Sequence, residues 1–187
     1  MQKIFLSFSV FILLWGCKEK AAPARDVKQY SIEQFYKTEG VSGGVFNKDE
    51  TKILINSNRT NIFNVYELTL ADSTTKPLTS STQESFFTVD YVPGTDHFIY
   101  SADKGGNEND HLYLQAGNGT VKDLTPGATE KASFFGWTKD KTQCYYISNK
   151  RNPKFFDVYK MDTAKWQPTM LYKNDRGLDV NSISFNE

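Results

Sequence analysis

Short apolar runs separated by polar turns occupy the chain from about residue 43 onward. Ile53-Leu54-Ile55 and Phe98-Ile99-Tyr100 are two such runs, and turn sequences such as Pro93-Gly94 and Gly117-Asn118-Gly119 lie between them. Short runs bounded by Gly, Pro, Asn and Asp are typical of β-strands, whereas helix pairs need longer periodic runs. The 14 Phe and 10 Tyr residues favour the same interpretation, because aromatic side chains fit half-buried sheet surfaces. The pattern therefore predicts an all-β fold.

The pattern also repeats along the chain. An aromatic residue, a polar turn containing Asp and an apolar run begin at Phe46, Tyr91 and Trp137, which are 45 and 46 residues apart. Phe185 continues the series 48 residues later. Other landmarks keep nearly the same period: Tyr66, Tyr113 and Tyr159, and the pair Leu78-Thr79, which recurs as Leu124-Thr125.

A period in the forties, with several short strands in each unit, is the signature of β-propeller blades. We expect an inner strand at the opening aromatic, a second after the Asp turn, a third carrying the Tyr and an edge strand before Leu-Thr. Residues 37–187 are therefore predicted to form an incomplete β-propeller, with blades at 43–80, 86–127 and 133–173 and the start of a fourth at 180–187. Propellers typically have about four to eight blades, so we expect the sequence to be truncated.

The first 16 residues have the pattern of a secretory signal peptide, with Lys3 followed by an apolar run from Ile4 to Trp15. The run is too short to span a bilayer, which needs about 20 residues. Leu14-Trp15-Gly16-Cys17 resembles a bacterial lipobox, with Trp15 in place of the usual small residue. That resemblance implies cleavage before Cys17 and lipidation of the cysteine. The alternative is a secreted protein with a chance cysteine.

Residues 17–36 are predicted to be the lipidated cysteine and a tether, because the segment after Cys17 is charged, small and without periodicity. A short helix is expected between Asp26 and Tyr36. The chain is thus predicted to be an exported lipoprotein, anchored to the membrane on the periplasmic or cell-surface face of the outer membrane. Lys18, which follows the cysteine, resembles sorting signals that disfavour retention in the inner membrane.

Charge and cysteine content exclude several functions. The 22 Lys and Arg balance the 22 Asp and Glu, so no nucleic-acid partner is predicted. If Cys17 carries lipid, Cys144 has no disulfide partner, and we expect it to be a buried, small hydrophobic residue. The sequence has no Gly-rich phosphate loop, C-x-x-C pair or H-E-x-x-H motif, so no cofactor is predicted.

The candidate catalytic groups do not combine into a site. Gly40-Val41-Ser42-Gly43-Gly44 matches G-x-S-x-G, but a nucleophile elbow needs a helix after the Ser, and a strand-like run follows instead. His97 and His111 lie in different parts of the second blade, without an obvious Ser and Asp beside either one. Asn107-Glu108-Asn109-Asp110 offers oxygen ligands but lacks the spacing of an EF-hand loop. We therefore assign no catalytic residue and no metal ligand.

Three basic residues are candidates for contacts with a partner. Arg59, Lys150 and Arg151 fall in comparable loops after the second strand of their blades, following Asn58 and Asn149. Charged loops at one end of a propeller could face a partner domain or a peptide terminus. The alternative is a solvated hairpin.

Several stretches resemble blades of the prolyl oligopeptidase (S9) family of serine peptidases, especially exported, lipobox-bearing members of the dipeptidyl- or acylaminoacyl-peptidase type. These stretches are Phe46–Leu54, Tyr100–Glu108, Asp123-Leu124-Thr125-Pro126-Gly127, Ser148–Arg151 and Phe155–Tyr159. The resemblance covers nearly everything from Ile32 to Glu187.

The resemblance implies that the parent protein is a serine peptidase, in which the propeller gates peptide access to a C-terminal α/β-hydrolase domain with Ser, Asp and His. That domain is absent from this chain, so the chain alone is predicted to lack a triad and to meet its peptide substrate only through the missing domain. Two alternatives remain: a non-enzymatic, lipid-anchored periplasmic binding or scaffold propeller, and a surface lipoprotein that captures peptides or glycans.

Overall fold

The computed structural model describes residues 25–184, and contacts divide the chain into two units, one ending at Lys37 and one beginning at Thr38. Within residues 25–37 the first unit contains one short helix, α1 (Ile32–Tyr36), as the sequence predicted. Ser31 starts the helix through a capping box, in which Gln34 N donates to Ser31 Oγ and Ser31 N donates to Gln34 Oε1. In the described part of the chain, no helix has the length and apolar content needed to cross a membrane.

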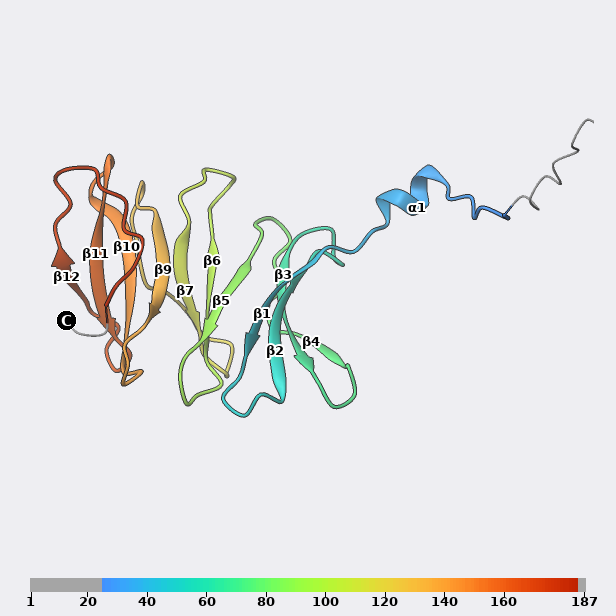
Figure 1. Cartoon of the computed structure of the whole chain (residues 1–187), viewed down its shortest axis with the longest axis horizontal. Coiled ribbons are helices and arrows are strands. Elements are labelled where there is room, and N and C mark those ends of the chain that lie inside the picture. The colour runs from blue at the N-terminus through green and yellow to red at the C-terminus, as the bar shows by residue number, and fades with distance from the viewer. Residues whose placement is uncertain (1–24, 185–187) are drawn as a thin grey trace, which may run out of the picture. The chain divides into compact units, whose positions relative to one another are not determined.

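The second unit consists of three four-stranded antiparallel sheets, each formed by strands that are consecutive in the sequence (Figure 1). This arrangement confirms the predicted all-β propeller fold with four-stranded blades. The first blade contains β1 (Val41–Phe46), β2 (Lys52–Ser57), β3 (Asn64–Thr69) and β4 (Thr75–Pro77). The second contains β5 (Phe87–Tyr91), β6 (Phe98–Ala102), β7 (His111–Gln115) and β8 (Val121–Asp123). The third contains β9 (Ala132–Trp137), β10 (Gln143–Asn152), β11 (Phe155–Asp162) and β12 (Pro168–Tyr172).

Each inner strand ends at its opening aromatic residue and carries a β-bulge in the same place. The bulged residues are Gly44 in β1, Val89 in β5 and Phe135 in β9, as the shifts in pairing with the second strands show. A bulge adds local twist and bends the strand. Because the bulges keep the sequence period, the three blades share one geometry.

The hairpins that join the first strand to the second, and the third to the fourth, all lie at one end of the blades, which we call the hairpin end (residues 47–51, 70–74, 92–97, 116–120, 138–142 and 163–167). Each hairpin contains one residue in the left-handed region: Glu50, Ser73, Gly94, Gly119, Lys141 and Trp166. Asp side chains close several of these turns, and Asp140 accepts hydrogen bonds from both the backbone and the hydroxyl of Thr142.

The blades pack face to face through apolar side chains. Tyr100 and Tyr113 of the second blade stack with ring centroids 5.2 Å apart, and Tyr100 belongs to the cluster that also holds the fully buried Leu54 and Val65 of the first blade. In the third blade Tyr146 and Tyr159 stack in the same way, at 5.2 Å, in the cluster with Ile99 and Leu112. Burying one such aliphatic side chain contributes about 1.5–3 kcal/mol, so these interfaces account for much of the stability.

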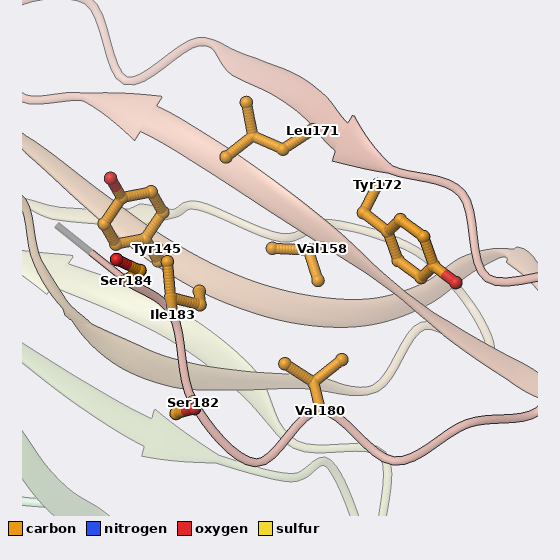
Figure 2. A pocket seen from close by; sticks show the side chains of 8 residues that line it. All are labelled: Tyr145, Val158, Leu171, Tyr172, Val180, Ser182, Ile183 and Ser184. Atoms are coloured by element: carbon orange, nitrogen blue, oxygen red, sulfur yellow. The ribbon is translucent and has the colours of Figure 1, made fainter. Parts of the chain in front are cut away.

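The far face of the third blade has the same apolar positions. Tyr145 and Val158 follow Ile99 and Leu112 by 46 residues, but here they line a cavity of about 440 Å³. Figure 2 shows that Val180 and Ile183, in the segment after β12, face the same cavity. In the first and second blades this face packs against the next blade. In the third blade the segment at 180–184 lies over it instead.

Candidate functional site

The opposite end of the blades contains the loops between second and third strands and the connections from one blade to the next. We call it the connection end; it comprises residues 38–40, 58–63, 78–86, 103–110, 124–131 and 173–184, together with 149–154, of which 149–152 are the last residues of β10. Arg59, Lys150 and Arg151 all lie at this end. Connections and loops carry most functional variation in repeated folds, so this end is the candidate functional surface.

Arg59 is held by its own blade. Its Nη2 lies 2.8 Å from Glu39 Oε1, and its Nη1 donates to Thr75 Oγ1 at 2.8 Å. The guanidinium also lies over the ring of Tyr66, 4.5 Å from the centroid. Glu39 accepts a further hydrogen bond from Ser57 Oγ at 2.6 Å, and this bond and Arg59 lower the pKa of the Glu39 carboxyl. Arg59 therefore fixes the first blade's loop.

Lys150 lies in strand β10, which corrects the expectation of a loop. The strand continues to Asn152 because, after an irregularity beyond Ser148, pairing resumes between Asn152 and Phe155. Lys150 Nζ lies 3.9 Å from Glu130 Oε2, too far for a hydrogen bond. The other oxygen of Glu130 accepts from Ser148 Oγ at 2.7 Å. Glu130 is only 4% exposed, so this is a buried carboxylate at the connection end.

Arg151 also lies in β10, again not in a loop, and it makes a buried ion pair. Its Nε and Nη2 donate to the two carboxylate oxygens of Asp157 at 2.7 and 2.8 Å. Asp157 is fully buried and accepts a further bond from Asn174 N at 2.8 Å. The Arg151 guanidinium lowers the pKa of the Asp157 carboxyl, and Asp175 lies 3.1 Å from Nη1 of the same arginine. Arg151 thus ties β11 to the segment after β12.

A sequence signal for these contacts was present but was missed. A Glu stands seven residues before each opening aromatic residue, and a basic residue stands thirteen after it. The series are Glu39, Glu84 and Glu130, and Arg59, Lys104 and Lys150. The structure shows why the two series keep the same register: in the first and third blades the Glu and the basic residue pair within one blade.

The second blade departs from this pattern. Ala102 occupies the position that Ser57 and Ser148 hold in the other blades, so the hydroxyl donor is lost. Among the described residues, Lys104 and Glu84 form no ion pair with each other, and Lys104 is exposed. Lys104 instead lines a cavity of about 360 Å³. The first blade also has a cavity at this end, of about 650 Å³ and lined by Arg59, but there the basic residue is paired with Glu39.

Another cavity, of about 560 Å³, lies at the hairpin end. It is lined by residues of the three hairpins that join the first strand of each blade to the second. Asp90 lines it and accepts a hydrogen bond from Trp137 Nε1 at 3.0 Å, which links the second and third blades. Burial raises the pKa of the Asp90 carboxyl. With Lys48, Glu50, Asp140 and Lys141 in its lining, the cavity combines both charge signs.

The residues of the G-x-S-x-G match lie in a strand. Ser42 belongs to β1 and pairs with Asn56, whose Nδ2 donates to Ser42 Oγ at 3.3 Å. The next element is the antiparallel strand β2, and no strand-to-helix turn exposes the hydroxyl. His97 lies at the hairpin end, and His111 at the connection end, where His111 Nδ1 is 2.8 Å from Asp123 Oδ2. Ser42 and the two histidines thus occupy separate places.

Cys144 is buried in the core, as predicted, with 2% of its surface exposed. Burial raises the pKa of its thiol to about 12. Cys17, the predicted lipidation site, lies outside the described residues. Within residues 25–184, no group of three His, Cys, Asp or Glu side chains is arranged to hold a metal ion.

Comparisons with known proteins agree with the fold. Dipeptidyl aminopeptidase BIII of Pseudoxanthomonas mexicana is 36% identical over 87 residues, a match that covers 46% of this chain and 12% of that protein. A prolyl endopeptidase structure aligns with a TM-score of 0.56 at 14% identity, covering 71% of this chain and 22% of the other. The structure of dipeptidyl peptidase 4 of Porphyromonas gingivalis aligns with a TM-score of 0.53 at 16% identity, covering 73% of this chain and 20% of the other. The structure of a putative TolB from Agrobacterium tumefaciens aligns with a TM-score of 0.56 at 21% identity, covering 72% of this chain and 47% of the other.

The chain thus spans only a small part of the peptidases that it matches. The family described as the dipeptidyl peptidase IV (DPP IV) N-terminal region matches residues 46–187, which include all three blades. The resemblance to S9 peptidase propellers noted in the sequence is confirmed at this level. The chain therefore belongs to the family of dipeptidyl peptidase IV N-terminal regions, the propeller family of the S9 serine peptidases.

Proposed function

We propose that this chain is the propeller part of an exported serine peptidase of the dipeptidyl- or acylaminoacyl-peptidase type, and that it gates peptide access to an α/β-hydrolase domain outside this chain. The observation that carries the proposal is the match of residues 46–187 to the propeller region of this peptidase family. In the mechanism we expect, a Ser of the hydrolase attacks the peptide carbonyl with a His as base. None of the residues described here takes part in that step.

The topology supports the connection end as the surface that faces the hydrolase. The chain enters β1 from residues 38–40, at the connection end, and each passage to the next blade also lies there. A domain joined to this propeller through such a connection lies nearest that end. The pairs Arg59–Glu39 and Arg151–Asp157 hold the loops of this end in place, which suits a rim that positions peptides.

A serine-directed fluorophosphonate probe tests the proposal. The product of the complete gene is expected to react with the probe and to release dipeptides or acylated amino acids from peptides. The 187-residue chain is expected to do neither, with or without Ser42→Ala. Peptidase activity of the 187-residue chain that disappears in Ser42→Ala would contradict the proposal, as would a complete gene product with no reactive serine.

Export and lipidation form a second part of the proposal, which the leader sequence and Cys17 support. Acyl chains anchor proteins because each buried CH₂ group contributes about 0.8 kcal/mol. Metabolic labelling with a palmitate analogue is expected to mark the wild-type protein and not the Cys17→Ser variant. Equal labelling of both, or recovery of the wild type in the inner membrane, contradicts the predicted anchor or its location.

A non-enzymatic, lipid-anchored binding propeller is the alternative. The fold is shared with a TolB structure, and the second blade has an open cavity at the connection end. Reading the gene beyond the codon for Glu187 separates the two functions. Further blades followed by alternating strands and helices with a G-x-S-x-G turn support the peptidase, and blades alone support the binding propeller.

A further inference from the structure

The loop between β6 and β7 is held in shape by its own side chains. Asp103 Oδ2 accepts a hydrogen bond from Glu108 N at 2.9 Å. Asn107 Oδ1 accepts from Asn109 N at 2.9 Å and from Lys104 N at 3.5 Å. Because the amide oxygen of Asn107 is used in this way, its NH₂ group is left to donate elsewhere. The loop therefore presents a defined donor beside Lys104.

His111 and Asp123 form the next wall of the same cavity. His111 Nδ1 lies 2.8 Å from Asp123 Oδ2, and Thr125 N donates to Asp123 Oδ1 at 3.0 Å. The imidazole also stacks on Tyr113, with centroids 6.1 Å apart. Both oxygens of the only carboxylate in the lining are thus engaged within the protein. Asp123 is thus held on both oxygens by contacts within the protein, and it positions the imidazole of His111.

The floor of the cavity consists of small residues. Gly127 and Ala128 line it, and a Cβ atom added at Gly127 would lie 2.8 Å from Glu130 Cβ. A side chain at this position would therefore clash with the buried glutamate next to it. Gly127 thus lets the backbone beside the cavity of about 360 Å³ approach Glu130 closely.

Besides Asp123, the polar groups of the lining are Asn109, the Tyr113 hydroxyl, His111, Lys104 and Asn107, and the last two supply donors for a ligand. Lys104 contributes an ammonium group that has no ion pair among the described residues, unlike Arg59 and Lys150 at the same position of the other blades. Asn107 contributes its NH₂ group. A cationic ligand would meet the Lys104 charge and a carboxylate that is already engaged. The Lys104 ammonium and the Asn107 amide favour a ligand that accepts hydrogen bonds and carries negative charge.

We propose that this cavity of the second blade, lined by Lys104, Asn107 and His111, binds a carboxylate group of a peptide. Lys104 pairs with the carboxylate, the Asn107 amide donates to one of its oxygens, and the ring of His111 lies against it. The carboxylate belongs either to the C-terminus of the peptide or to an acidic side chain. Binding requires only the second blade and its connections, so it goes beyond the peptidase proposal and does not depend on a hydrolase domain.

The two histidines of the chain provide a direct test. Their ring C–H signals are followed by NMR in the full chain, with His97 at the hairpin end as the internal control. Four probes are titrated: N-acetyl-Ala-Ala with a free C-terminus, its C-terminal amide, N-acetyl-Glu-Ala-amide and N-acetyl-Gln-Ala-amide. We expect a saturable shift of His111, and not of His97, with at least one carboxylate probe and with neither neutral probe.

Substitutions complete the test. Lys104→Gln is expected to weaken binding about tenfold or more, because it removes the charge of the pair. Asn107→Asp keeps an oxygen for the turn but replaces the donor with a negative charge, and it is expected to abolish binding. Lys139→Gln, at the hairpin end, is the matched control and should leave binding unchanged.

Each outcome has a definite meaning. Binding of the free C-terminus or of the Glu probe supports the proposal and identifies the source of the carboxylate. The proposal is overturned if neither carboxylate shifts His111, if the neutral probes bind equally well, or if Lys104→Gln and Asn107→Asp both bind as the wild type does.

Discussion

The two ends of the blades are stabilised in different ways. At the hairpin end each turn is closed by residues close in sequence, such as Asp49 with Thr51 and Asp140 with Thr142. The connection end has local contacts too, in the loop 103–110, but it also has contacts between residues far apart, such as Glu130 with Ser148, 18 positions on, and Arg151 with the carbonyl of Asn174, 23 positions on. Local contacts close the six hairpin turns, with backbone bonds such as Leu70 N to Thr51 O joining the two hairpins of one blade, whereas the contacts of the connection end differ from blade to blade.

This difference has a consequence for function. A substitution in one hairpin is expected to act mainly on that turn and on the hairpin bonded to it in the same blade. A substitution at the connection end uncouples a loop from the next blade connection, so it affects both stability and the shape of the surface. In the second blade Ala102 stands where the other blades have Ser57 and Ser148, and Lys104, which forms no ion pair among the described residues, lines a cavity.

The largest effect is expected for Asp157→Asn at the connection end. The variant should lose about 3 kcal/mol in free energy of unfolding, because it breaks a buried ion pair. We expect the low end of the range for such pairs, since a quarter of the Arg151 side chain is exposed. Urea denaturation measures the loss. The exposed Asp175→Asn is the control, with a loss below about 1 kcal/mol. Equal losses in the two variants would show that the buried pair does not dominate.

The contribution of Asp157 should depend on pH. Its pKa is lowered in the folded protein by Arg151, so its stabilisation is present above the unfolded Asp pKa of about 3.9 and is lost as pH falls through the folded pKa. The difference in unfolding free energy between wild type and Asp157→Asn should be constant from pH 7 to about 5 and should shrink toward pH 2. A difference that grows on acidification would contradict this sign.

An intermediate effect is expected for the serine that donates a hydrogen bond to a glutamate in both the first and the third blade. The glutamate of the third blade is the more buried of the two. Ser148→Ala leaves Glu130 Oε1, in a carboxylate that is 4% exposed, without its donor, and should cost about 2 kcal/mol. Ser57→Ala should cost less than about 1 kcal/mol, because Glu39 keeps the bonds from Arg59 and is partly exposed. Thermal and urea unfolding of both variants test this order, and the reverse order would contradict the account of the two blades.

The smallest effect is expected at the hairpin end. Lys141 has φ of 59°, a conformation that costs a residue with a side chain about 1 kcal/mol more than it costs glycine. Glycine also loses more conformational entropy on folding, which offsets part of this gain. Lys141→Gly should therefore raise the free energy of unfolding by about 0.5 kcal/mol. Lys141→Ala, which keeps the strained conformation, should not. A gain in Lys141→Ala as large as that in Lys141→Gly would indicate a charge effect instead.

The hairpin end could be predicted from the sequence, because its signals are local. Phe46, Tyr91 and Trp137 marked the ends of the inner strands, and the Asp turns after them marked the hairpins. The blade repeat and the all-β fold followed from these landmarks. The bulges at Gly44, Val89 and Phe135 were not predicted, because a bulge depends on the pairing with a neighbouring strand.

The connection end could be predicted only in part. Arg59, Lys150 and Arg151 were chosen for their charge and position, but their carboxylate partners were not identified. The partners Glu39 and Glu130 lie 20 residues earlier than Arg59 and Lys150, and only the repeat register relates them. The extension of β10 through Lys150 and Arg151 was missed because Asn149 and Asn152 resemble turn residues. The cavity of the second blade depends on loop packing, which spacing alone does not reveal.

Hydrogen exchange on the complete gene product tests most directly whether the connection end faces the rest of the protein. The rates are compared with those of the 187-residue chain in the loops 58–63 and 103–110 at the connection end and in the turns 47–51 and 92–97 at the hairpin end. We expect the connection-end loops to exchange more slowly in the complete protein and the hairpin turns to show no change. Slower exchange at the hairpin end alone, or no change at either end, would contradict this expectation.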